Sequence, residues 1–143
     1  MTDLKNELFK VVTGFHEAIF KATQGRLGGR VAGMPVLILH TTGRKSGQRR
    51  STMLTTPVKD EDRIVIVASK GGDPKHPTWF LNLEANPDVE VTIDGGTKPM
   101  KARTATKAEK DELWPQITGT YKGYAGYQQR TDRDIPVVIL EPR

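Results

Sequence analysis

Hydrophobic residues recur at helical spacing in the first part of the chain. Apolar side chains stand three or four positions apart from Leu4 to Ile19, with charged residues between them. This period is typical of an amphipathic helix, which we predict over residues 2–23. Residues 24–34 contain several glycines and are typical of a flexible connector.

The rest of the chain carries short apolar runs bounded by turn residues, a pattern that predicts β-strands. The predicted strands are Val36–Thr42, Arg49–Thr56, Ile64–Ser69, Val89–Ile93, Met100–Ala105 and Pro136–Leu140. We expect the last strand to lie at a sheet edge, because the proline that opens it has no backbone N–H.

Two further helices are predicted between these strands. Residues Thr78–Ala85 form a short helix that stops before a proline. Thr106 and Glu109 form a capping box that opens another helix, which Pro115 should kink or restart. This order of elements indicates an α+β domain with a mainly antiparallel sheet. About six strands in so short a chain favour a small barrel or half-barrel flanked by helices.

Composition limits the class of protein. The 143 residues carry a net charge of +5, and the absence of cysteine excludes disulfides and thiolate metal sites. No apolar run approaches the roughly 20 residues of a membrane span, and no signal-peptide segment opens the chain. We therefore expect one soluble domain in the cytoplasm. The pI near 9.6 favours an anionic partner: a phosphorylated or polycarboxylate ligand, a nucleic acid or an acidic membrane surface.

The stretch Thr41–Arg50 contains four basic residues, two glycines and no acidic residue. Glycine permits the positive φ of a tight turn, so backbone N–H groups can converge there. Backbone donors and guanidinium groups together suit a phosphate or a carboxylate. A solvated basic turn is the alternative, and the loop alone does not decide between the two.

No group of side chains forms a self-sufficient acid–base or nucleophilic site. His16, His40 and His76 are widely spaced and lack the pattern of metal ligands, so we expect structural roles for them. The serines lack the context of a nucleophile elbow. If the chain is an enzyme, a bound cofactor is expected to carry the reaction.

Two other stretches suit a ligand pocket. In the first, a strand leads into Ser69, Lys70 and two glycines, which allow a ligand to approach the backbone closely. Trp79 and Phe80 follow, and they either wall a planar ligand or fill the core.

In the second stretch, the chain's three tyrosines, Tyr121, Tyr124 and Tyr127, stand at spacing three, roughly on one face if helical. They form either the edge of a core or an aromatic lid over a pocket. Of the three, Tyr121 is expected to be the most structural, because it lies nearest the preceding helix.

At these residues the sequence resembles the deazaflavin-dependent nitroreductase and quinone reductase family of actinobacteria. The signatures are TTGRKSGQ-R from Thr41, ASKGG----P-W--NL--NP-V-V from Ala68, and the tyrosine triplet followed by TDR-IPVV from Thr131. The resemblance implies a split β-barrel, related to the flavin-binding oxidases of the pyridoxamine phosphate type. It also implies hydride transfer from reduced coenzyme F-420 to an electron-poor acceptor, such as a quinone, a coumarin-type lactone or a nitroaromatic compound.

The resemblance further implies roles for single residues. The phosphate and glutamate tail of the coenzyme would bind Arg44, Lys45, Ser46 and Arg50. The deazaflavin ring would lie against Ser51, Thr52, Met53, Leu54, Val67, Ala68, Ser69 and Lys70, with the pocket closed by Thr78, Trp79, Phe80, Leu81 and Asn82. The acceptor site would be shaped by Thr55, Tyr121, Tyr124 and Tyr127, with Ser69, Tyr124 and Tyr127 near the reacting centre.

One departure from the family pattern concerns the acceptor. Relatives that reduce nitroimidazoles commonly carry Asn-Pro-Leu-Tyr where this chain has Thr52-Met53-Leu54-Thr55, so a wider or altered pocket is expected. An FMN-dependent oxidoreductase of the same barrel class is the alternative enzyme.

The non-enzymatic alternative is a basic binding protein for an anionic ligand, a nucleic acid or a membrane. The aromatic residues lie away from the basic loop, which argues against nucleic acid, and any membrane-surface association is expected to be weak. The choice between monomer and homodimer stays open.

Overall fold

The computed structural model describes residues 30–143, so the helix predicted over residues 2–23, with His16, lies outside the described residues. The strands are β1 (Arg30–Val31), β2 (Met34–Thr42), β3 (Arg49–Thr55), β4 (Val58–Lys59), β5 (Ile64–Val67), β6 (Asp88–Ile93), β7 (Gly96–Thr104) and β8 (Val137–Pro142). The helices are α2 (Thr78–Ala85), α3 (Lys107–Thr120) and α4 (Gly123–Gln129), with a short turn η1 (Lys70–Gly72). Over residues 30–143 the element order is the one that the sequence predicts, with two additional two-residue strands, the turn η1 and the separate helix α4.

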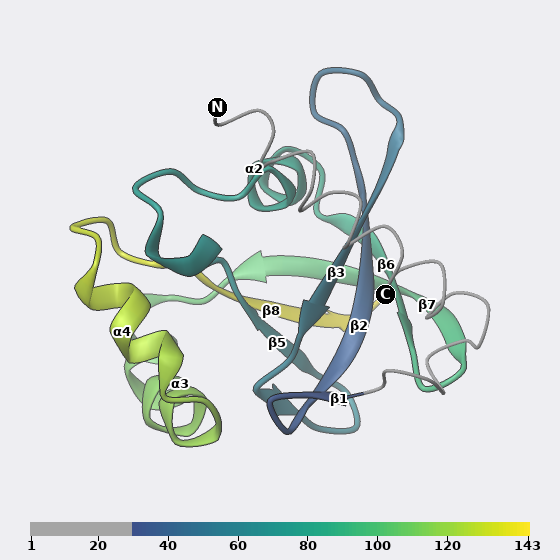
Figure 1. Ribbon diagram of the computed structural model, residues 1–143. Coiled ribbons are helices and arrows are strands. Elements are labelled where there is room, and N and C mark those ends of the chain that lie inside the picture. Colours follow the sequence, from purple (N-terminus) through teal and green to yellow (C-terminus); the bar gives the residue numbers. More distant parts are fainter. Residues whose placement is uncertain (1–29) are drawn as a thin grey trace.

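The strands form one antiparallel sheet in the order β1-β2-β6-β7-β8-β5-β4, and β3 pairs with β2 outside this path. Strand β2 therefore pairs with β3 as well as with β6. Figure 1 shows the curved sheet with α2 on one side, and with α3 and α4 together beyond β5 and β8. The predicted α+β split barrel is confirmed.

Strands β5 and β8 are buried on both faces. Ile64 and Ile66 of β5 belong to the main core inside the curved sheet. Val65 and Val67 alternate with them and belong to a second core, which includes Leu113 of α3. Side chains of β8 alternate between the same two cores. A strand buried on both faces is expected to be continuously apolar, which explains these sequences.

The prediction that the last strand lies at an edge is wrong. Strand β8 pairs with β5 on one side and with β7 on the other. Pro136 precedes the strand, and its carbonyl accepts a hydrogen bond from the Ala68 N–H at 2.9 Å. The missing N–H of proline is harmless at this entrance, because the strand itself begins at Val137.

Helix α3 begins with the predicted capping box. The Thr106 side chain accepts from the Glu109 N–H at 3.2 Å, and the Glu109 carboxylate accepts from the Thr106 N–H at 3.0 Å. The helix runs through Pro115, so this proline does not restart it. The Arg103 guanidinium lies 2.8 Å from the Glu109 carboxylate. This hydrogen bond, with the one from the Thr106 backbone, lowers the pKa of Glu109 to about 2.

We expect Glu109→Gln to lower the free energy of unfolding at neutral pH and to have no effect in strong acid. Because the pKa falls from 4.5 to about 2 on folding, the stabilisation is present above pH 4.5 and disappears as the pH approaches 2. Urea midpoints of both proteins over this pH range measure the effect.

Glu112→Gln on the same helix is the control, since Glu112 makes no ion pair within residues 30–143. A midpoint difference for Glu109→Gln that stays constant with pH would contradict the account.

Candidate active site

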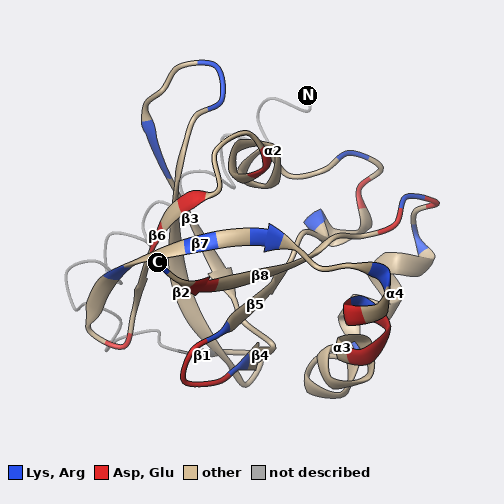
Figure 2. Ribbon diagram, turned by 180° about the vertical axis from the view of Figure 1, so that it is seen from behind, with Lys and Arg blue, Asp and Glu red and all other residues tan. Residues whose placement is uncertain are grey.

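The hairpin of β2 and β3 carries the basic loop at its tip, beyond the rest of the sheet (Figures 1 and 2). The Gly43 N–H donates to the Gln48 carbonyl, and the Gly47 N–H donates to the Gly43 carbonyl, each at 2.8 Å. Gly47 has a φ of 71°, and a Cβ on Gly43 would lie 2.6 Å from Ser46 Oγ. The two glycines thus allow the tight turn that the sequence predicts.

A cavity of about 250 Å³ lies against this loop. It is lined by Gly43, Arg44, Lys45, Ser46, Arg50, Thr78 and Asn82. No acidic side chain lines the cavity, and within residues 30–143 no ion pair involves its three cations. The cavity therefore presents unneutralised positive charge, which suits phosphate and carboxylate groups.

Buried Asn82 fixes the basic loop to helix α2. Its Oδ1 accepts from the Arg44 N–H at 3.1 Å, and its Nδ2 donates to Thr41 Oγ1 at 3.4 Å. Thr78 is the first residue of α2, whose first turn contains no acidic residue. The positive end of the helix dipole thus adds to the cationic character of the cavity.

The fourth basic residue of the loop differs from the other three. The Arg49 guanidinium pairs with the Glu90 carboxylate on β6, and its hydrogen bond and charge lower the pKa of Glu90. Arg49 does not line the cavity. Arg49 therefore has a structural role. The other three cations of the loop, Arg44, Lys45 and Arg50, are those predicted to bind the coenzyme tail.

A larger cavity, of about 610 Å³, lies between β3, the end of β5, η1, the start of α2 and the tyrosines. It falls within the size range of small-molecule sites. The predicted residues that line it are Thr52, Met53, Leu54, Thr55, Val67, Ser69, Lys70, Trp79, Tyr121, Tyr124 and Tyr127. The structure therefore brings together segments that lie far apart in the sequence.

Six residues predicted to contact the coenzyme ring lie outside this cavity. Ala68 and Phe80 are buried in the main core, and Leu81 packs against it. The Ser51 hydroxyl lies 2.8 Å from Nδ1 of His40. The last two, Thr78 and Asn82, border the small basic cavity instead.

Sequence reasoning missed one wall of the larger cavity. This wall is formed by β1 and β2, which contribute Val31, Met34 and Val36. Val31 is half-exposed at 50%. The strand was predicted to begin only at Val36, and the connector predicted over residues 24–34 is wrong at its end, since Val31 lies in β1 and Met34 begins β2.

The turn η1 has a left-handed backbone. Lys70, Gly71 and Gly72 have φ values of 46°, 63° and 82°. A Cβ on Gly72 would lie 2.7 Å from the Tyr127 carbonyl oxygen and 2.9 Å from Arg130 Cβ. Gly72 is therefore needed both for its φ and for the close approach of η1 to α4. Lys70 is not glycine, and its backbone stores strain of order 1–3 kcal/mol.

The three tyrosine rings form a cluster at α4, the helix that packs against η1. Their centroids lie 5.3, 6.0 and 6.3 Å apart. The three tyrosines do not share one helix, because Tyr121 follows the end of α3 in an extended conformation while Tyr124 and Tyr127 lie in α4. Tyr124, not Tyr121, is the most buried of the three, at 6% exposure. The rings meet because the chain turns between the two helices.

The tyrosine hydroxyl groups contact one another and β3. The Tyr124 hydroxyl lies 3.4 Å from Thr55 Oγ1, and the Tyr121 and Tyr127 hydroxyls lie 3.4 Å apart. Burial raises the pKa of Tyr124, and the hydrogen bond with Tyr121 raises the pKa of Tyr127. Both hydroxyls therefore stay protonated at neutral pH and can donate hydrogen bonds.

His40 and His76 lie outside both cavities. The two ring nitrogens of His40 lie 2.8 Å from Ser51 Oγ and 2.7 Å from Thr92 Oγ1, and His76 accepts from Arg133. Within residues 30–143 no cluster of three potential metal ligands is present. In the same part of the chain no helix is long and apolar enough to cross a membrane.

Comparison with known proteins identifies the family. Residues 13–142 match the model of the F420H(2)-dependent quinone reductases, where F420H(2) is reduced coenzyme F-420. The chain belongs to this family. An F420H(2)-dependent quinone reductase of Mycobacterium tuberculosis is 45% identical over 132 residues, which cover 90% of this chain and 88% of the relative. The resemblance stated from the sequence motifs is thereby confirmed.

Solved structures that are similar to this chain include two relatives at 42% and 36% identity. One is an F420-H2 dependent reductase, with a TM-score of 0.68 and 42% identity over 75% of this chain and 94% of the other. The second is described as a domain-swapped dimer, with a TM-score of 0.70 and 36% identity over 98% of both chains. Family membership makes this protein an oxidoreductase that uses reduced coenzyme F-420 to reduce quinones, and it favours this coenzyme over FMN.

Two glycines of α4 offer a matched test of the tyrosine cluster. A Cβ on Gly123 would lie 2.4 Å from the ring of Tyr121, whereas a Cβ on Gly126 would have no atom within 4 Å. Alanine favours a helix by roughly 1 kcal/mol over glycine. We therefore expect Gly126→Ala to raise the melting temperature and Gly123→Ala to displace the Tyr121 ring, visible as a changed near-UV circular dichroism. Equal spectra for the two variants would contradict the packing described.

Proposed function

We propose that the two cavities hold the two ends of coenzyme F-420, the deazaflavin ring in the larger cavity and the acidic tail in the basic one. The observation that carries the proposal is the acid-free cavity beside an aromatic one. Strand β3 borders both, with Arg50 at the basic cavity and Thr52 at the larger cavity. Helix α2 does the same, since Thr78 borders one and Trp79 the other.

The residues present fit this coenzyme, which joins a planar ring to a phosphate and several glutamates. Three cations without acidic neighbours complement the tail. The larger cavity is mostly apolar in its lining, and Trp79 and Leu54 suit a planar ring. The bound coenzyme supplies the hydride, so the protein's task is to hold the ring, exclude water and bind the acceptor.

The proposed acceptor site lies under the tyrosine cluster. The protonated hydroxyls of Tyr124 and Tyr127 are suited to donate hydrogen bonds to an acceptor oxygen that gains negative charge. Ser69, 8% exposed at the wall of the same cavity, is proposed to act beside them. Thr55 leaves space where nitroimidazole-reducing relatives carry tyrosine, so coumarin-type lactones are proposed as further acceptors, ahead of nitroaromatic compounds. The cytoplasmic location expected from the sequence belongs to the same proposal.

Titration of the protein with coenzyme F-420, followed by coenzyme fluorescence, tests the function directly. We expect saturable binding at micromolar coenzyme, and oxidation of the reduced coenzyme when a soluble quinone is added. Absence of binding at these concentrations would overturn the proposal. Copurification of a yellow flavin with the spectrum of FMN would instead support the alternative cofactor.

We expect Arg44→Ala or Arg50→Ala to weaken coenzyme binding. A hydrogen bond to a charged group contributes roughly 1.5–3 kcal/mol, which corresponds to about ten- to a hundredfold in Kd. The Kd of the unaltered protein should also rise with salt, because the basic loop is exposed. Fluorescence titration at several salt concentrations measures both effects.

Arg63→Ala serves as the control, since Arg63 pairs with Asp60 at 3.0 Å and lines neither cavity. Normal coenzyme affinity in both loop variants would show that the loop is only a solvated turn.

Tyr124→Phe and Tyr127→Phe should slow turnover while leaving the Kd for the coenzyme unchanged. Each change removes one hydroxyl donor and keeps the ring, so we expect a loss in kcat on the order of tenfold. Steady-state kinetics with a quinone and a coumarin, beside coenzyme titrations, separate the two effects. Full turnover with every acceptor, or loss of coenzyme binding, would count against the proposed role.

A further inference from the structure

One side chain, that of Arg133, holds both ends of the left-handed turn η1. Arg133 Nε donates to the Asp73 carbonyl at 2.7 Å, after the turn. Its two terminal nitrogens donate to the Ala68 carbonyl at 3.1 Å and the Ser69 carbonyl at 2.7 Å, before the turn. The guanidinium also donates to Nδ1 of His76 at 3.1 Å, beside the start of α2.

The turn needs such support because its backbone is strained. Positive φ at Lys70 is unfavourable and persists only where the surrounding structure enforces it. Two backbone hydrogen bonds close the turn, from the Gly72 N–H to Ser69 and from the Asp73 N–H to Lys70, at 2.9 and 3.1 Å. Arg133 adds three charge-assisted bonds that span the same segment, and its rigid fork reaches carbonyls that a single ammonium group cannot reach together.

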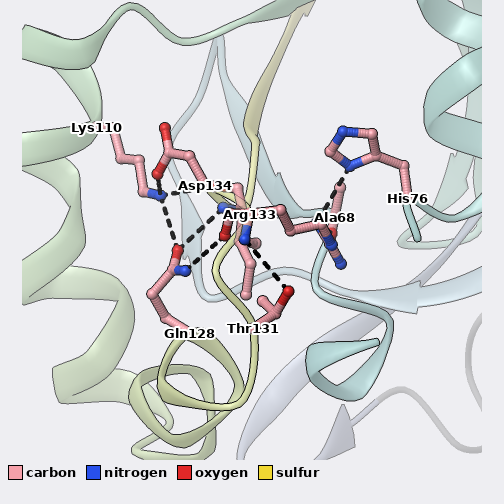
Figure 3. A network of polar contacts seen from close by, with 8 residues as sticks. Ala68, His76, Lys110, Gln128, Thr131, Arg133 and Asp134 are labelled. Atoms are coloured by element: carbon pink, nitrogen blue, oxygen red, sulfur yellow. Dashed lines mark hydrogen bonds and ion pairs between the residues drawn. The ribbon is translucent and has the colours of Figure 1, made fainter. Parts of the chain in front are cut away.

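Arg133 is in turn fixed to the helix that carries two of the tyrosines. Its carbonyl accepts from Gln128 Nε2 at 2.8 Å, and its N–H donates to Thr131 Oγ1 at 3.3 Å. Gln128 Oε1 accepts from the Ile135 N–H at 3.0 Å and from Lys110 of α3 at 3.2 Å (Figure 3). One network therefore joins η1, α3, α4 and the start of β8.

Both segments joined by this network line the larger cavity. Ser69, Lys70 and Gly71 line it from the side of η1, and Tyr124 and Tyr127 line it from the adjoining helix α4. We propose that Arg133 is a positioning residue that sets these two segments relative to each other, by holding η1 in its left-handed form against α4. The effect on the ligand rests on the proposed function, whereas the effect on the turn does not.

Hydrogen exchange of the ligand-free protein tests the effect on the turn. In Arg133→Met we expect the amides of Gly72 and Asp73 to exchange at least about tenfold faster, as after the loss of one charged hydrogen bond, with the β6–β7 amides unchanged. Arg133→Lys keeps the charge but cannot span the carbonyls, so we expect the same increase. If Arg133→Met does not fold, Arg133→Lys alone decides. Unchanged exchange at both amides would overturn the proposal.

Arg143→Met is a matched control. Arg143 also donates to two carbonyls, those of Met100 at 2.9 Å and Val89 at 3.2 Å, and it lines neither cavity. We expect this variant to lose stability without faster exchange at Gly72 or Asp73. Equal acceleration in the Arg143 and Arg133 variants would reduce Arg133 to general stabilisation and overturn the proposal.

Coenzyme titration of the same variants tests the consequence for the ligand. We expect the Kd to rise about tenfold in Arg133→Met and Arg133→Lys and to stay within about twofold in Arg143→Met. Full affinity in Arg133→Lys would show that charge and not geometry matters, which would overturn the positioning role. If the unaltered protein does not bind the coenzyme, the proposed function fails, while the exchange result still decides the role of Arg133 in the turn.

Discussion

The register between β2 and β3 is the constraint on which both cavities depend. The two strands pair from Val36 with Thr55 to Thr42 with Arg49. A slip of one residue would turn every side chain of β3 to the other face. The observed register places Arg50 beside the basic loop and Thr52 at the larger cavity, while Arg49 reaches the carboxylate of Glu90. One hairpin thereby fixes both the charge and the position of the site.

The curved sheet cannot hold a ligand in its interior, because its own side chains fill it. Leu37, Leu39 and Ile64 are fully buried there with side chains from β6, β7 and β8. The cavities therefore form at the edge of this core, where β3 leaves the path of the sheet and the helices α2 and α4 approach. This arrangement lets loops and helix ends supply the ligand contacts while the core supplies stability.

The sequence predicts those features of the fold and the site that depend on residues close together in the chain. The apolar runs define the strands, Thr106 and Glu109 define a helix start, and the acid-free glycine loop indicates an anion site. Pairing partners depend on distant contacts, so β8 was predicted at an edge although it is central. The tyrosine spacing suits one face of a helix, whereas the chain turns after Tyr121 and the rings meet through that turn. The sequence did not indicate the role of Arg133 beyond its place in the family motif, because its carbonyl partners lie some sixty residues away in the chain.

A crystal structure with coenzyme F-420 bound tests the central claim most directly. We predict that the deazaflavin ring lies between β3 and η1, beside the tyrosine cluster, and that the phosphate lies within hydrogen-bonding distance of Arg44, Lys45 or Arg50. Such a structure would also show how much space remains over the ring for a quinone. A ring outside the larger cavity, or an acidic tail directed away from the basic loop, would contradict the account.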